Sequence, residues 1–182
     1  MMIYTEITPN PATLKFVVEM TLLPQGSADF TSPEDAVESG LAKQLFEYEF
    51  ISGVFIGYNF ISVTKSESKA WEEVIPAIKT MIRNFLATGE PILKTMPELS
   101  QTSTDESDTV QRIKKLLDEN IRPAVAMDGG DITFESFEEG IVKLEMKGAC
   151  SGCPSSTQTL KMGIEGLLTR MVPGVLRVEA IS

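Results

Sequence analysis

The feature that most constrains this chain is a short segment, residues 148–157, which contains both cysteines, Cys150 and Cys153. Residues 141–146 before it alternate in polarity and predict a strand. Residues 160–171 after it carry apolar side chains at helical spacing, and a proline directly after the second cysteine suits the first helical turn. Both sulfurs are therefore expected at a strand-to-helix turn, where the positive end of the helix dipole favours thiolate over thiol. Thiolate is the form that binds soft metals and performs redox chemistry.

The chemistry open to this segment is narrowed by what the sequence lacks. The chain has 182 residues, two cysteines and no histidine. The lack of histidine excludes His-based acid–base catalysis, serine-type triads that use His, and His-containing zinc or haem sites within the chain. A disulfide that closes so short a loop would stabilise the fold little, so a purely structural bridge is disfavoured.

Charge and hydropathy exclude further classes of protein. Acidic residues outnumber basic ones by 26 to 16, and both halves of the chain share the excess. A protein that binds nucleic-acid phosphates usually has a basic patch, so no nucleic-acid partner is expected. No window approaches the roughly 18 continuous apolar residues of a membrane helix, and the N-terminus lacks the pattern of a secretory signal. We expect a soluble cytoplasmic protein or, alternatively, the processed form of a mitochondrial matrix protein.

The periodicity predicts an α+β fold of two small domains joined by a flexible acidic linker. Residues 1–89 predict a strand, a helix, two strands joined by a tight turn at Tyr58 and Asn59, and a long helix. Residues 90–107 lose this periodicity and become polar, small and acidic, as linkers are. Residues 108–182 predict a helix, a hairpin, the cysteine turn with its helix, and a last strand.

One segment in each domain gives a more specific expectation. In the first domain, one helix is expected to begin at Ser32 and to turn Val37 and Leu41 towards the core. In the second domain, Asp128 and Asp131 flank a glycine pair. They could form a catalytic acid pair, but the glycines favour a structural turn that ends a helix.

The cysteine pair has two classes of interpretation. A dithiol/disulfide oxidoreductase would use the helix N-terminus, but too little chain follows Cys153 to complete a thioredoxin-like sheet. A metal site is the other interpretation. Two thiolates are half of what tetrahedral zinc or an iron–sulfur cluster requires, so a second copy of the chain or external thiols must supply the remainder.

The sequence around the cysteines resembles the Nfu family, iron–sulfur cluster scaffold and carrier proteins related to the C-terminal domain of NifU. The matching segments are MDGGDI at 127–132, GACSGCPSS at 148–156 and TLKMGIE at 159–165. Residues 8–16 resemble the opening of that family's N-terminal domain. The resemblance thus covers both expected domains, in the expected order.

This resemblance implies a carrier and not an enzyme. Its cargo would be a [4Fe-4S] cluster held by Cys150 and Cys153 of two subunits, in a homodimer that forms when the cluster is bound. The implied partners are upstream cluster-assembly proteins and apo iron–sulfur clients, with the N-terminal domain aiding docking. A zinc-clipped dimer and the oxidoreductase remain alternatives.

Overall fold

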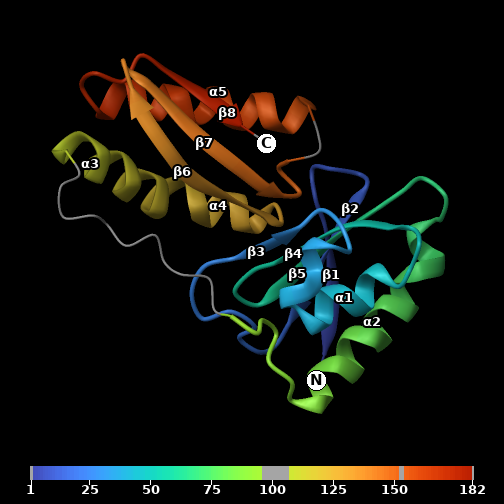
Figure 1. Ribbon diagram of the computed structural model, residues 1–182. Coiled ribbons are helices and arrows are strands. Elements are labelled where there is room, and N and C mark those ends of the chain that lie inside the picture. Colours follow the sequence, from blue (N-terminus) through green and yellow to red (C-terminus); the bar gives the residue numbers. More distant parts are fainter. Residues whose placement is uncertain (1, 96–106, 152–153, 182) are drawn as a thin grey trace. The chain divides into compact units, whose positions relative to one another are not determined.

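The computed structural model of the protein describes residues 2–95, 107–151 and 154–181 (Figure 1). The chain divides into two compact units, Met1–Leu99 and Ser100–Ser182. Each unit combines a β-sheet with helices, so the α+β class expected from the sequence is confirmed. Among the described helices, none is both long enough and apolar enough to cross a membrane.

The first unit is built on a five-stranded antiparallel sheet with the strand order β1-β2-β5-β4-β3. The strands are β1 (Ile3–Ile7), β2 (Thr13–Val18), β3 (Ala28–Phe30), β4 (Ile51–Ile56) and β5 (Phe60–Lys65). The predicted tight turn at Tyr58 and Asn59 separates β4 from β5. The edge strands β1 and β3 were not predicted from the sequence.

Helices α1 (Gly40–Phe46) and α2 (Trp71–Thr88) pack on this sheet through one hydrophobic core. Alternate residues of β2 enter that core, among them Phe16, which is fully buried. Ile78 on α2 is also fully buried. The long helix predicted at the end of this domain is confirmed. It ends at Gly89, whose φ of 72° is the left-handed conformation that glycine adopts readily.

The single helix predicted from Ser32 is wrong, because the segment forms two helices. A short 3-10 helix, η1 (Asp35–Glu38), precedes α1, and Ser39 between them has extended backbone angles. The Ser39 hydroxyl accepts a hydrogen bond from the backbone N–H of Ala42 and so begins α1. Val37, predicted to face the core, is 58% exposed.

The expected linker begins later than residue 90. Leu93 is buried in the core of the first unit. The Ser39 hydroxyl donates to the carbonyl oxygen of Ile92 at 2.7 Å. The backbone N–H of Lys94 donates to the carbonyl oxygen of Glu38 at 2.8 Å. Residues 92–94 are thus held by the first unit, and the remainder of the expected linker, 96–106, lies outside the described residues.

The second unit contains a three-stranded sheet with the order β6-β7-β8. Strands β6 (Gly130–Glu138) and β7 (Ile141–Gly148) form the predicted antiparallel hairpin, turned at Glu139 and Gly140, which both have positive φ. Strand β8 (Arg177–Ile181) pairs parallel to β7. Because a parallel neighbour requires a crossover connection, helix α5 (Pro154–Met171) runs between the two strands.

One continuous helical segment precedes this sheet and includes a π-helical turn. It consists of α3 (Asp108–Leu116), η2 (Leu117–Ile121) and α4 (Arg122–Met127). Ser107 caps it through a hydrogen bond from Val110 N–H to its hydroxyl. In η2 the N–H of Arg122 donates to the carbonyl of Leu117, five residues back. This wider turn accommodates Pro123, which has no N–H to donate and whose ring crowds the carbonyl four residues back.

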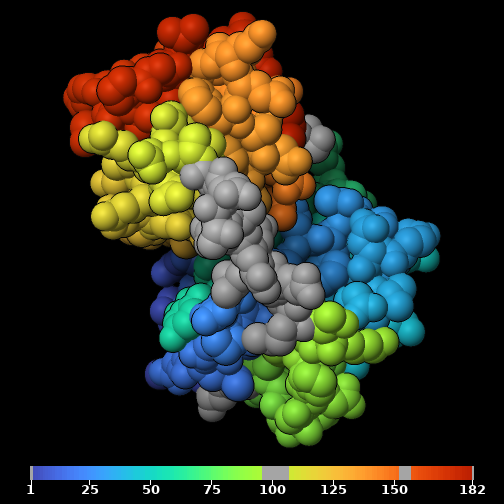
Figure 2. Space-filling view, turned by 60° about the vertical axis from the view of Figure 1, so that its left-hand side comes forward, coloured from blue at the N-terminus to red at the C-terminus, as the bar shows by residue number. Residues whose placement is uncertain are grey.

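The helices of the second unit share one core with one face of its sheet. Along β7, Val142, Leu144 and Met146 are buried, whereas Lys143 and Glu145 between them are partly exposed. The helices contribute buried residues such as Ile113 and Ile164 to the same cluster. Figure 2 shows α3 and α4 in yellow, the hairpin in orange and the red C-terminal part of the chain on the surface of this unit. Each element therefore contributes to both core and surface.

Candidate metal centre

The end of β7 forms a tight turn that carries the first predicted ligand. Gly148 has a φ of 66°, so the chain reverses there at no steric cost. The N–H and hydroxyl of Ser151 both donate to the Gly148 carbonyl, at 3.1 and 2.9 Å. The N–H of Ala149 donates to the carbonyl of Gly129 at 3.2 Å. The cysteine turn is thereby fixed against Gly129, which directly precedes β6.

Cys150 is a free thiol within this turn, and its side chain lies in the hydrophobic core of the second unit. The residue is only 5% exposed. Its sulfur lies close to Gly130: a Cβ added there would be 2.8 Å from Sγ and 2.5 Å from the carbonyl oxygen of Lys147. Any residue other than glycine would therefore displace the sulfur or the strand.

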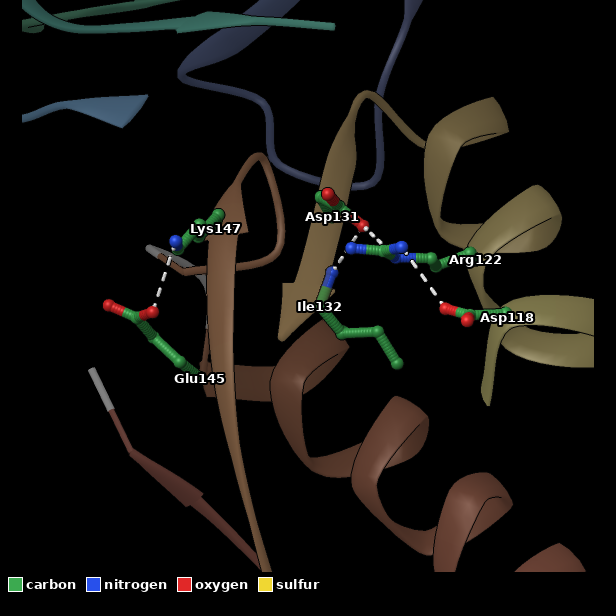
Figure 3. Close-up of polar contacts among 6 residues, drawn as sticks. All are labelled: Asp118, Arg122, Asp131, Ile132, Glu145 and Lys147. Carbon is green, nitrogen blue, oxygen red and sulfur yellow. Dashed lines mark hydrogen bonds and ion pairs between the residues drawn. The ribbon is translucent and has the colours of Figure 1, made fainter. Parts of the chain in front are cut away.

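Asp131, the second residue of β6, connects this strand to the helical segment before it (Figure 3). Its Oδ1 accepts hydrogen bonds from Nε of Arg122 at 3.1 Å and from the backbone N–H of Ile132 at 2.8 Å. Nη1 of Arg122 also donates to Oδ1 of Asp118 at 3.0 Å. The Arg122 guanidinium thus links η2 to β6. These contacts support the structural interpretation of Asp131 over a catalytic one.

The environment of Cys150 disfavours its thiolate in the chain as described. Burial, and to a smaller degree the negative charges of Asp128 and Asp131, together raise the pKa of the thiol from 9.0 to about 12. The prediction that the helix N-terminus favours thiolate is therefore wrong for Cys150. Its sulfur lies in the core before α5 begins, where desolvation and two carboxylates outweigh the helix dipole. The predicted ligand Cys153 lies outside the described residues.

A metal held by the described residues would need further ligands. Nowhere in the described ranges do three Cys, Asp, Glu or His side chains gather as a metal site would require. The Cys150 sulfur is a soft donor suited to iron or zinc. It can serve as one ligand of a shared site but cannot form a site alone.

Thr157 contacts the cysteine turn although the sequence did not single it out. Its hydroxyl, on the first turns of α5, donates to the Cys150 carbonyl at 2.7 Å. A threonine near a helix start was the available signal, because its hydroxyl can bond to nearby backbone groups. For Gly130, the sequence predicts only a role in ending the preceding helix. Its proximity to Sγ follows from the hairpin register, in which Gly130 pairs with Gly148.

Two family models match the chain. The model described as scaffold protein Nfu/NifU N terminal matches residues 3–89, and the model described as NifU-like domain matches residues 113–179. The first match lies within the first unit and the second within the second unit. Together they cover most of the chain.

Full-length relatives share both regions. The chain is 43% identical over 184 residues to the NFU1 iron-sulfur cluster scaffold homolog, mitochondrial, of Drosophila sechellia, covering 100% of this chain and 65% of that protein. The protein of the same name from Drosophila persimilis is 45% identical, with the same coverage of both chains. The NifU-like protein 4, mitochondrial, of Arabidopsis thaliana is 43% identical over 185 residues, covering 98% of this chain and 65% of that protein. The chain thus spans about 65% of the length of these relatives.

Among solved structures, a solution structure of the NifU-like protein from Saccharomyces cerevisiae is 26% identical, with a TM-score of 0.47. The match covers 52% of this chain and 85% of that chain. The two family models and the three relatives settle the relationship of the chain. With an Nfu/NifU N-terminal region followed by a NifU-like domain, this chain belongs to the Nfu family.

Proposed function

We propose that the chain is a scaffold and carrier for iron–sulfur clusters, not an enzyme. The observation that carries the proposal is the free thiol of Cys150 on the strand-to-helix turn of the NifU-like domain, in a chain with no histidine. The names of the relatives, which describe iron–sulfur cluster scaffolds, agree with this role. The cargo would be bound by sulfur alone.

The cluster is proposed to be a [4Fe-4S] cluster shared by two copies of the chain. Such a cluster takes four cysteine ligands, and one chain has only Cys150 and Cys153. A two-fold dimer supplies each of them twice and completes the set. The dimer would form with its cargo.

Transfer to a client needs only ligand exchange. Thiolates of an apo iron–sulfur protein would replace the cysteines of the carrier stepwise, so no acid–base residue is required. The core position of Cys150 provides the released sulfur with a packed resting place in the cluster-free chain. Upstream assembly proteins would supply the cluster, and the N-terminal domain would help clients to dock.

The oxidoreductase alternative gains no support from Cys150. A redox-active cysteine is accessible and has a lowered pKa, whereas Cys150 is buried and its pKa is raised to about 12. A zinc-clipped dimer would use the same ligands as the cluster. Metal analysis separates it from the proposed carrier.

A mitochondrial location is proposed for the protein. The relatives from flies and from Arabidopsis thaliana are named mitochondrial proteins. Their names favour the matrix alternative drawn from the sequence over the cytoplasmic expectation.

Anaerobic reconstitution of the full chain with iron and sulfide tests the proposed function. We expect about four irons and four sulfides per dimer, and loss of both in Cys153→Ala, because half of the ligands are then missing. Equal iron in the variant would contradict the proposal. Zinc in place of iron, in protein purified without oxygen, would favour the zinc-clipped dimer.

A further inference from the structure

Two contacts involve Cys150, one at its sulfur and one at its backbone. The sulfur lies against Gly130, where an added Cβ would be 2.8 Å from it. The hydroxyl of Thr157 donates to the Cys150 carbonyl at 2.7 Å. The first contact comes from the start of β6, the strand paired with β7, and the second from α5, which follows the cysteine turn, so two elements outside the turn contact the same residue.

The hydrogen bond from Thr157 is suited to fixing the backbone position of Cys150. It is partly buried and joins residues seven apart in sequence, and Cys153 lies between them. A partly buried carbonyl that loses its donor is left poorly satisfied, so removing the hydroxyl frees the backbone of Cys150 to move. Thr169, later on α5, makes a bond of the same length to the carbonyl of Glu165, but that bond is exposed and lies within the helix.

We propose that Thr157 is a positioning residue for Cys150: its hydroxyl anchors the backbone of this ligand in both the cluster-free and the loaded protein. The inference rests on the proposed function, in which Cys150 binds the cluster. In the cluster-free chain the anchor keeps the sulfur in the core. In the loaded chain it limits the freedom of the ligand to leave the iron.

The test compares Thr157→Val, which keeps the side-chain shape without the hydroxyl, with Thr157→Ser, which keeps the hydroxyl. In cluster-free protein that also carries Cys153→Ser, Cys150 is the only thiol. Its rate of reaction with Ellman's reagent then measures how often it leaves the core. We expect Thr157→Val to raise this rate between about twofold and tenfold, the range for one hydrogen bond, and Thr157→Ser to restore the slow rate.

The second measurement uses the full chain with both cysteines, loaded without oxygen. The iron chelator bathophenanthroline disulfonate removes the cluster, and the loss of visible absorbance gives the rate. We expect Thr157→Val to accelerate this loss by a similar factor and Thr157→Ser to restore slow loss. Thr169→Val is the matched control, since it removes an equal hydroxyl–carbonyl bond of α5 far from the turn in sequence, and it should change neither rate. Circular dichroism verifies that each variant is folded.

The outcomes separate the two proposals. If the unmodified chain takes up no cluster, the proposed function fails, and the thiol reaction rates still decide whether Thr157 positions Cys150. Equal thiol reaction rates with and without Thr157→Val, both in protein that carries Cys153→Ser, would overturn the positioning role. So would a Thr157→Ser variant as fast as Thr157→Val, because the hydroxyl would then not be responsible. Faster thiol reaction without faster cluster loss would overturn the role towards the cluster.

Discussion

At the scale of single residues, Cys150 faces opposite demands on its sulfur. In the cluster-free chain it is a neutral thiol packed in the core, whereas a ligand to iron must be a thiolate. Burial and the charges of Asp128 and Asp131 stabilise the neutral form. In the proposed carrier, the same environment would make the cluster-bound form less favourable, which would suit a cargo that is passed on.

The raised pKa of Cys150 predicts a pH dependence for the stability of the cluster-free chain. The thiol ionises above pH 9 in the unfolded chain but only near pH 12 in the folded one, so rising pH favours unfolding. The stability that this group contributes is complete below pH 9 and is lost between pH 9 and 12. Above pH 9 the loss is on the order of 1.4 kcal/mol per pH unit.

Urea unfolding of the unmodified chain and of Cys150→Ala at several pH values measures this effect. Other groups titrate in both proteins, so the difference between their unfolding free energies isolates Cys150. We expect the advantage of the unmodified chain over the variant to shrink as the pH rises from 9 towards 12. Parallel pH profiles would contradict the placement of this thiol in the core.

At the scale of elements, Ser39 connects two parts of the first unit, helix α1 and the segment that follows α2. Ser39 is fully buried, and its hydroxyl begins α1 by accepting a hydrogen bond from Ala42 N–H. The same hydroxyl holds the segment after α2 by donating to the Ile92 carbonyl. Ser39→Ala should lower the unfolding free energy of this unit by about 1–3 kcal/mol, because a helix cap and a buried bond are lost together.

The fluorescence of Trp71, the only tryptophan and a residue of α2, reports unfolding of the first unit in urea. Ser32→Ala is the matched control, since the Ser32 hydroxyl accepts one bond from Asp35 N–H at an exposed position. It should cost clearly less than Ser39→Ala. Equal costs would show that the Ser39 contacts do not stabilise the unit.

The elements that were predicted correctly are those with a strong local pattern. The hairpin of β6 and β7 alternates in polarity, and α5 carries an apolar face, so both can be read from neighbouring residues. Strand β1 has only one buried residue, Ile3, and β3 has three residues, so neither has a pattern to read. Their structure depends on pairing with β2 and β4, which is set by distant sequence.

The candidate site shows the same division. The position of Cys150 at a strand-to-helix turn followed from local sequence. Its burial did not, because it depends on contact with Gly130, which the hairpin register brings beside the turn. Local sequence indicates that a helix dipole lies near the cysteine and should lower its pKa. The desolvation and the charge of Asp131 that raise the pKa of Cys150 depend on the folded chain and cannot be read from local sequence.

At the scale of the whole molecule, charge opposes association of two copies. Each chain has a formal net charge of −10 at pH 7, so two cluster-free copies repel each other. A bridging cluster would supply the attraction that overcomes this repulsion, because binding that favours the dimer stabilises it by mass action. We therefore expect a monomer without cargo and a dimer with it.

Native mass spectrometry of the full chain, before and after anaerobic loading, tests this sharing of one cluster most directly. The predicted result is a single chain before loading and, after it, two chains that carry one [4Fe-4S] cluster, separating again when a chelator removes the iron. A loaded species that contains one chain, with no added thiol to complete the four ligands, would contradict the proposed carrier.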